Sequence, residues 1–213
     1  MVAAFRRTLL TNARSAGLSL SDHELASFET HYRLLQKWNR RMNLTGLKDE
    51  EAIVRRHFLE PMAVADLLAS DGRLVDLGSG NGFPAIPLKV LRPGLDLVLV
   101  ESSEKKSAFL WAVLREVGLK DARVETRRVQ SLSDLADLLP CRYLTLRAVR
   151  VGDVLTGKEI PILRPDGMAL LFVTPQQAAT LGRNSLPGLR LSGTRPLPSG
   201  PRSIVAIFEP QVG

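Results

Sequence analysis

A glycine-rich turn between an apolar run and a helical stretch constrains this chain more than any other feature. Residues 73–77 are predicted to form a short buried strand, residues 76–83 carry glycines at three positions, and residues 85–91 are predicted to form a helix. Because glycine has no Cβ, the backbone turns sharply there and a ligand lies directly against amide groups. The pattern predicts an α/β domain with a ligand site at the end of its first strand.

After residue 71 the chain alternates apolar runs with helical stretches. Further strands are expected at residues 96–101, 122–126, 143–148, 167–173 and 203–208. Alternation at this spacing predicts a mostly parallel, doubly wound sheet. Residues 186–202 contain four prolines and three glycines, which favours loop and edge strand. The strand at 203–208 is expected to close the sheet, antiparallel to a strand at 189–191.

Residues 1–70 are expected to be helical and to form an N-terminal extension to a domain at 71–213. Ser21 and Glu24 fit a capping box, and an apolar stripe follows it as far as Met42, with Asn43–Gly46 ending that helix. Asp49 is expected to begin a second helix, and Pro61 to lie in the first turn of a third, short helix that ends near residue 68.

Composition narrows the class of protein. Hydrophobic residues make up 45% and charged residues 24%, which is typical of a globular chain. One cysteine and three scattered histidines exclude a disulfide framework and predict no metal site. Arginines at positions 6 and 7 argue against a signal peptide, and no apolar run approaches the roughly 20 residues of a membrane span, so we expect a cytoplasmic protein. The net charge of +7 favours a polyanionic partner such as nucleic acid.

Two cofactor classes use a glycine turn of this kind. A dinucleotide site has a third glycine at the position of Phe83, and its pyrophosphate disfavours a carboxylate such as that of Asp76. S-adenosylmethionine has no phosphate, and its cationic groups are compatible with that acid. Glu101 ends the second strand, where a carboxylate accepts hydrogen bonds from ribose hydroxyls. These residues favour S-adenosylmethionine, with Gly78 and Gly80 against the cofactor.

Several motifs together resemble the rRNA small subunit methyltransferase G family, also called RsmG or GidB. The similarity runs from about residue 34 to residue 208 and is densest from residue 43 to residue 82. The matching motifs, in chain order, are Asn43-Leu44-Thr45, Arg56-His57, Asp76-Leu77-Gly78-Ser79-Gly80-Asn81-Gly82-Phe83-Pro84, Ile86-Pro87-Leu88, Leu146-Arg147-Ala148 and Arg202.

This resemblance implies a class I S-adenosylmethionine-dependent methyltransferase with a Rossmann-like sheet and a small helical N-terminal extension. It implies transfer of a methyl group to N7 of a guanosine in 16S ribosomal RNA. Matched by motif, the cofactor contacts are Gly78, Phe83, Val129, Gln130 and Arg147. Two departures stand out: Gln130 lies where the family usually has an acid, and residues 172–175 lack the family's usual Lys-Gly pair after strand five.

The end of strand four indicates which acceptor suits the site. It lacks the Asp/Asn-Pro-Pro-aromatic motif of enzymes that methylate exocyclic amines, and Cys141 precedes the strand, where an inert packing role is favoured over a nucleophilic one. Guanine N7 has a free lone pair and needs no deprotonation. We therefore expect catalysis by positioning, with Arg147 as the catalytic residue.

RNA contacts are expected from the extension. Residues 33–56 contain seven basic side chains against three acidic ones. Trp38 and Phe58 are candidates to stack bases, whereas Tyr32 lies on the apolar stripe and is expected in the core. The candidate RNA-binding residues are Asn43, Arg56, His57 and Arg202.

The partner implied is 16S ribosomal RNA in the small ribosomal subunit, bound by a monomer, with no membrane partner. Two other interpretations stay open. One is a divergent methyltransferase acting on another RNA or on a small molecule, which the departure after strand five favours. The other is a non-catalytic S-adenosylmethionine-binding module that recognises RNA.

Overall fold

The computed structural model describes residues 2–147, 160–183, 186 and 188–211. Its centre is a seven-stranded sheet with the strand order β3-β2-β1-β4-β5-β7-β6. The strands are β1 (Asp71–Leu77), β2 (Gly94–Glu101), β3 (Ala122–Thr126), β4 (Cys141–Arg147), β5 (Leu163–Val173), β6 (Leu189–Pro196) and β7 (Ile204–Pro210).

The first five strands pair in parallel, and β7 pairs antiparallel with both β5 and β6. The predicted mostly parallel, doubly wound sheet is therefore confirmed, as is the antiparallel last strand. That strand does not close the sheet, because it inserts between β5 and β6 and leaves β6 at the edge. The carboxyl ends of β1, β2 and β4 lie at one edge of the sheet, where open α/β sheets bind ligands.

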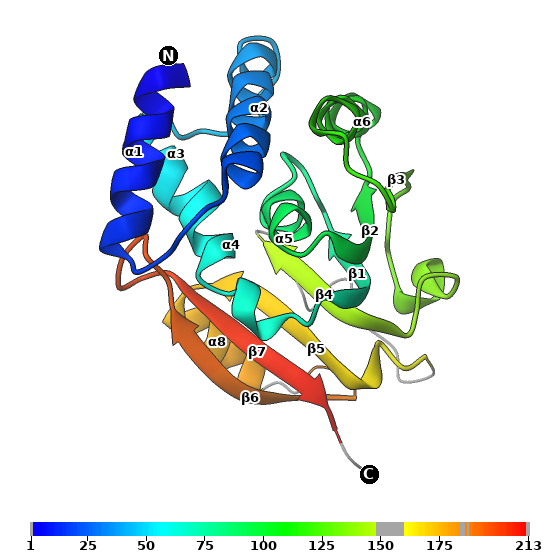
Figure 1. Ribbon diagram of the computed structural model, residues 1–213. Helices are drawn as coiled ribbons and strands as arrows, with labels where there is room; N and C mark the ends of the chain where they lie inside the picture. Colours follow the sequence, from blue (N-terminus) through cyan, green and yellow to red (C-terminus); the bar gives the residue numbers. More distant parts are fainter. Residues whose placement is uncertain (1, 148–159, 184–185, 187, 212–213) are drawn as a thin grey trace.

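Helices cover both faces of the sheet (Figure 1). The N-terminal extension contributes α1 (Val2–Ser15), α2 (Asp22–Asn39) and the shorter elements up to residue 67. These pack on the same face as α5 (Ala85–Leu91) and α6 (Glu104–Val117), while α8 (Pro175–Arg183) and a 3₁₀ turn, η3 (Leu132–Leu135), lie on the other. The helix expected between β4 and β5 falls on residues 148–159, outside the described residues.

One apolar core joins the extension to the sheet. Phe5 of α1, Phe28 of α2 and Phe58 belong to the same buried cluster as Leu74 of β1 and Phe172 of β5. Alternate residues of the strands point into a second cluster on the opposite face, as expected for strands buried on both sides. The extension therefore shares one core with the sheet, and the predicted division at residue 70 remains a prediction.

The helix α2 begins as predicted and ends earlier. Its capping box is present, with the Ser21 amide donating to Glu24 Oε2 at 2.6 Å. The helix stops at Asn39, so Met42 lies beyond it, which corrects the expected end near Asn43. The Asn39 side chain accepts hydrogen bonds from the amides of Leu44 and Thr45 at 2.9 and 3.0 Å, which fold the chain back before the apolar stripe ends.

The predicted third helix is confirmed in part, because Pro61 does lie in the first turn of a short helix, but this helix continues directly from the one before it and ends well before residue 68. A single helical path runs through α3 (Glu50–Ile53), a π-helical segment, η1 (Val54–Leu59), and α4 (Glu60–Met62), and a 3₁₀ turn, η2 (Ala65–Leu67), follows. Asp49 does cap this path, accepting from the Ala52 amide at 2.8 Å. Proline has no N–H to donate, and the wider turn, in which the Glu60 amide bonds to Arg55 O, lets the path continue through Pro61.

Other boundaries differ from prediction by a few residues. β5 begins at Leu163 instead of 167, and β4 begins at Cys141 instead of 143. Within the described ranges, none of the helices combines the length and the apolar composition needed to span a bilayer.

Candidate active site

The glycine turn, residues 76–83, is hydrogen-bonded to the neighbouring strand β2. The amides of Gly78 and Ser79 both donate to Val100 O of β2, at 2.9 and 3.1 Å. Gly78, Gly80 and Gly82 have φ values of +70°, +55° and +83°, a region that disfavours side chains. At Gly82 an added Cβ would also lie 2.5 Å from the Ile86 Cδ1 atom. The turn therefore depends on glycine, and it leaves backbone exposed at Gly78.

Asp76 lies buried beneath this turn with one oxygen available. Its Oδ1 accepts a hydrogen bond from the Thr145 hydroxyl of β4 at 2.5 Å, whereas its Oδ2 has no partner in the part of the chain that the structure describes. Burial raises the pKa of Asp76 to about 6, with the hydrogen bonds of Thr145 and Ser79 opposing the shift. A buried carboxylate oxygen without a partner is costly, so a cationic ligand would stabilise it. The site thus suits the positive charges of S-adenosylmethionine.

Glu101 fixes the turn from the end of β2. Its Oε2 accepts from the Gly80 amide and its Oε1 from the Ser103 amide, both at 2.8 Å. A carboxylate has about four acceptor positions, so both oxygens retain capacity for ribose hydroxyls. Glu101 holds Gly80 in place, and its predicted ribose contact stays a prediction.

Phe83, at the end of the turn, lies between two histidines of the extension. The ring of His31 stacks on Phe83 with centroids 4.3 Å apart, and that of His57 stacks on it at 4.4 Å, both nearly parallel. Two rings at these distances overlap if placed on one face, so they occupy opposite faces. We call this group the His-Phe-His stack. All three side chains are buried, so Phe83 offers the cofactor little of its ring and His57 lies inside the protein.

Hydrogen bonds tie the stack to the extension. His31 Nε2 donates to Asn81 O at 3.0 Å, and the Asn81 side chain donates to Leu44 O at 3.1 Å. His57 Nε2 lies 3.1 Å from the hydroxyl of Thr45. Desolvation lowers the pKa of His31 to about 4 and that of His57 well below its ordinary value, where the charge of Arg147 adds to the effect. Both imidazoles are neutral at physiological pH, and the extension is joined to the cofactor turn by uncharged contacts.

Arg147 ends β4 and forms a buried ion pair with Glu60 of α4. Its Nη2 lies 2.6 Å from Glu60 Oε2, its Nη1 donates to Arg56 O at 2.7 Å, and its guanidinium lies 4.5 Å from the Phe172 ring centroid. Burial lowers the pKa of Arg147 to about 10, with Glu60 opposing the shift, so the side chain stays charged. Arg147 therefore faces the extension and the end of β5 together.

Glu60 is the centre of a further set of contacts. Its side chain is 1% exposed, and its Oε1 accepts from the hydroxyls of Ser199 and Ser203, the latter at 2.5 Å. Arg202 precedes Ser203 and is exposed, so this turn carries it to the surface beside the Glu60–Arg147 pair. Arg56 is also exposed while its carbonyl binds Arg147. The structure thus groups two predicted RNA-binding residues around the predicted catalytic arginine.

The remaining predicted residues lie on surface loops. Val129 and Gln130 follow β3, with Val129 half-buried and Gln130 exposed; the Gln130 amide donates to Asp134 Oδ2 at 2.8 Å. Asn43 is exposed just beyond α2, in the loop whose carbonyl at Leu44 binds Asn81. None of these placements tests a contact with cofactor or RNA.

The surroundings of Cys141 match the packing role predicted for it. It is buried in β4, its pKa is raised to about 12 by burial, and its thiol donates to Ile162 O at 3.5 Å. Over the described residues there is no cluster of three histidine, cysteine, aspartate or glutamate side chains that would hold a metal ion.

Sequence reasoning missed four residues that build the site: His31, Asn81, Glu60 and Thr145. Two of them had a signal that could have revealed them. His31 lies beside Tyr32 on the apolar stripe of α2, and Thr145 places a hydroxyl in an otherwise apolar strand. Glu60 gave no signal, because its partners lie 87 and 139 or more residues away in the chain.

The model of the family described as rRNA small subunit methyltransferase G matches residues 24–183. The chain belongs to this family. Relatives carrying the name "Ribosomal RNA small subunit methyltransferase G" include one from Chloroflexus aggregans, 37% identical over 80% of this chain and 72% of its own length. Another, from a Roseiflexus species, is 40% identical over 76% of this chain and 70% of its own length.

Solved structures agree on the fold at much lower identity. A fibrillarin/Nop5p complex matches 79% of this chain and 90% of its own with a TM-score of 0.60 and 14% identity. A ribosomal protein L11 methylase from Lactobacillus delbrueckii matches 78% of this chain and 81% of its own with a TM-score of 0.54 and 12% identity. Family and fold together confirm the predicted class I, Rossmann-like methyltransferase and S-adenosylmethionine as its cofactor.

Proposed function

We propose that this chain transfers the methyl group of S-adenosylmethionine to N7 of a guanine in 16S ribosomal RNA of the small ribosomal subunit, acting as a monomer. The observation that carries the proposal is the buried Asp76 beneath the glycine turn, with an oxygen that lacks a partner among the described residues, in a chain of the rRNA small subunit methyltransferase G family. Membership of this family supports ribosomal RNA as the substrate, and this oxygen of Asp76 supports a cationic cofactor at the glycine turn.

The cofactor residues have distinct tasks in this proposal. Gly78 and Gly80 present backbone without a Cβ, Glu101 binds the ribose, and Val129 and Gln130 contact the adenine from the loop after β3. Phe83 acts through its backbone, since its ring is held in the His-Phe-His stack. When bound, S-adenosylmethionine supplies an electrophilic methyl group.

Transfer to guanine N7 needs no general base, because this ring nitrogen has a free lone pair. The protein has to align the acceptor, exclude water and keep both reactants in place, and orientation of this kind contributes roughly 7–11 kcal/mol to lowering a barrier. Arg147 suits that task. Its guanidinium stays charged and is held in a fixed direction by Glu60 and by the carbonyl of Arg56. In the complex it contacts the cofactor carboxylate or the target nucleotide.

RNA recognition is assigned to exposed residues around that arginine. Arg56 and Arg202 are exposed, the Arg56 carbonyl and the adjacent Ser203 contact the Glu60–Arg147 pair, and Asn43 lies on the loop bound to the glycine turn. His57 acts as a positioning residue instead, since its ring is buried against Phe83. Residues 1–70 thus form an RNA-facing extension and residues 71–213 the methyltransferase domain in this proposal.

One departure from the family favours a second candidate, a methyltransferase for another RNA or a small molecule. β5 is followed by Thr174 and Pro175, where the family's usual Lys-Gly pair would add a cation. Arg147 compensates in part, because its guanidinium lies over Phe172 at the end of β5. A salt titration of substrate affinity separates the candidates: each neutralised phosphate contributes a log-log slope of roughly −0.7 to −0.9, and a small-molecule enzyme shows almost none.

The deciding experiment is methyl transfer from tritium-labelled S-adenosylmethionine to small subunits from a strain that lacks its own guanine-N7 enzyme. We expect label in 16S rRNA and a new site of chemical cleavage at one guanosine. Label at another base or on another RNA would move the chain to the second candidate. Binding of S-adenosylhomocysteine without transfer to any RNA or ribosomal particle would leave a non-catalytic binding module.

A further inference from the structure

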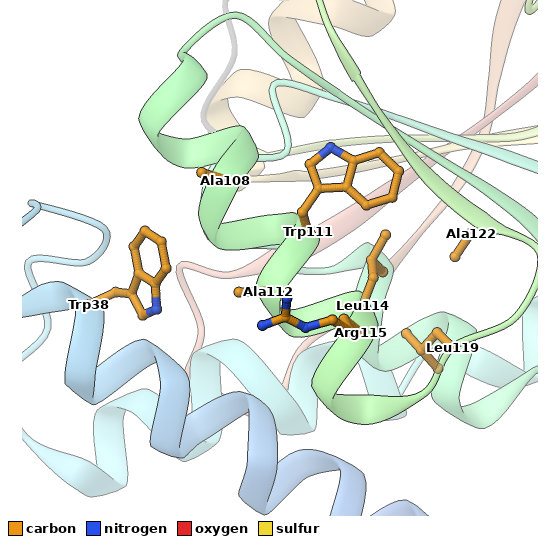
Figure 2. A pocket seen from close by; sticks show the side chains of 8 residues that line it. All are labelled: Trp38, Ala108, Trp111, Ala112, Leu114, Arg115, Leu119 and Ala122. Atoms are coloured by element: carbon orange, nitrogen blue, oxygen red, sulfur yellow. The ribbon is translucent and has the colours of Figure 1, made fainter.

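A groove of about 710 Å³ lies between α2 and α6, on the outside of the helical layer. Figure 2 shows Trp38 from α2 and Trp111 from α6, with the small side chains of Ala108 and Ala112 between them. Arg115, one turn beyond Trp111, also lines it. The groove presents two indoles and a guanidinium and is separate from the glycine turn.

The two tryptophans are held differently. Trp38 is half-buried and packs edge-on against Phe109 of the core, with ring centroids 5.8 Å apart. Trp111 is 49% exposed, and among the described residues no other large hydrophobic side chain is exposed. One indole is thus anchored, and the other offers a face to solvent.

Positive charge is concentrated around this groove. Residues 33–41 and 104–120 together carry eight basic and two acidic side chains, a net charge of +6 in a chain whose total is +7. Arg33 bridges to Glu116 at 3.7 Å, and Arg115 to the same carboxylate at 3.6 Å, so one of the two acidic side chains is already paired with arginines. An apolar groove inside a basic surface complements a nucleic acid better than an apolar peptide.

We propose that the groove between α2 and α6 binds an unpaired base of the RNA substrate, stacked on Trp111 with Arg115 beside it. Aromatic rings and guanidinium planes are the surfaces on which single-stranded bases stack. The inference rests on the proposed function, because it takes RNA as the substrate. It adds an RNA subsite away from the reacting atoms.

The groove lies along α6 from Ala108 onward and extends to Leu119 and Ala122 at the start of β3, away from the glycine turn. α6 begins at Glu104, three residues after Glu101, and Trp111 follows seven residues later. At 1.5 Å per residue this is roughly 10 Å along the helix, about the rise of three stacked nucleotides. In this proposal the stacked base is therefore separated from the target guanosine by at least a few nucleotides.

Intrinsic fluorescence tests the proposal directly, since the only two tryptophans of the chain both line the groove. The probe is a short single-stranded oligoadenylate titrated into the full chain. We expect saturable quenching that weakens with salt, in the native chain and in Trp38→Phe, where Trp111 alone reports. In Trp111→Phe, where Trp38 alone reports, stacking on the substituted ring should leave weaker quenching. No quenching in Trp38→Phe would overturn the proposal.

Kinetics with small subunits form the second arm. Trp111→Ala should raise KM about 5- to 150-fold, the range expected for one lost base–aromatic stack, with kcat unchanged. Trp111→Phe should restore most of the affinity, and Arg115→Gln should raise KM more than Arg183→Gln, which removes an exposed charge from α8 on the opposite face of the sheet. An unchanged KM in an active Trp111→Ala enzyme contradicts the subsite while the proposed function stands.

Two other outcomes are informative. If the native chain transfers no methyl group, the proposed function fails, and the fluorescence arm still decides whether the groove binds RNA. If sedimentation shows a dimer that Trp111→Ala dissociates, the groove is an interface between copies of this chain and the RNA subsite is wrong.

Discussion

Replacing Arg147 by alanine leaves a buried carboxylate without its counter-charge. Glu60 is 1% exposed, and Arg147 Nη2 lies 2.6 Å from its Oε2, while the two serine hydroxyls on Oε1 bring no positive charge. Breaking one side of a buried ion pair costs about 3–5 kcal/mol. Since the unfolding free energy of a domain is roughly 5–15 kcal/mol, the variant should be folded but much less stable.

Urea unfolding measures this cost. With a slope of about 2–3 kcal/mol per molar, the midpoint of Arg147→Ala should fall by about 1–2.5 M. The matched double variant Glu60→Gln with Arg147→Ala should recover more than half of the loss, because glutamine still accepts the hydroxyls of Ser199 and Ser203 without burying a charge. Methyl transfer should be lost in the single and in the double variant.

Two results would refute this reasoning. If Arg147→Ala lowers the unfolding free energy by less than about 1 kcal/mol, the pair with Glu60 does not stabilise the fold as its burial implies. If the double variant regains both stability and methyl transfer, Arg147 serves only to neutralise Glu60, and its proposed contact with cofactor or nucleotide is wrong.

Three further predictions concern the turn and its surroundings. Since the pKa of Asp76 is raised to about 6, wild-type affinity for S-adenosylmethionine should fall as pH drops below 6, and calorimetry should find Asp76→Asn weaker and independent of pH in that range. The folded-state pKa of His31, about 4, lies below its ordinary 6.5, so its contribution to stability is complete above 6.5 and lost toward 4. His31→Phe should therefore flatten the pH dependence of urea unfolding by up to about 3 kcal/mol, and an unchanged slope would count against burial as the cause. Gly82→Ala, whose Cβ would meet Ile86 at 2.5 Å, should cost about 1–3 kcal/mol in the same assay, whereas Gly46→Ala, with nothing within 4 Å, should stay near wild type.

The strands were predictable because each carries a local signal. Runs such as residues 96–101 are apolar on both faces, and the turn at residues 76–83 punctuates the first of them. Where a boundary was missed, the local pattern was misleading. β5 starts at Leu163, and Arg164 and Asp166 lie exposed in its first half. In the sequence these polar residues look like part of a loop, so the start was placed too late.

The end of α2 shows a different limit. Its apolar stripe continues to Met42, yet Asn39 ends the helix through hydrogen bonds to amides five and six residues later. Side-chain hydrogen bonds to the backbone compete with helix formation, and the sequence alone does not reveal which asparagine forms them. The same holds for Glu60, whose contacts depend on strands and turns that follow much later in the chain.

The continuous helical path through Pro61 links the extension to the candidate active site, because side chains of this path contact both the glycine turn and Arg147. Its π-helical segment carries His57, which stacks on Phe83 of the glycine turn, and three residues later Glu60, which holds Arg147 at the end of β4. A π-helical turn has one more residue than an α-helical turn, so it rotates the residues that follow it about the helix axis. The π-helical segment therefore affects the directions in which His57 and Glu60 point. Because one short segment contacts the cofactor turn and the arginine together, movement of the extension on binding RNA would reach both. Under the proposed function, the extension is therefore a part of the catalytic site as well as a surface for RNA.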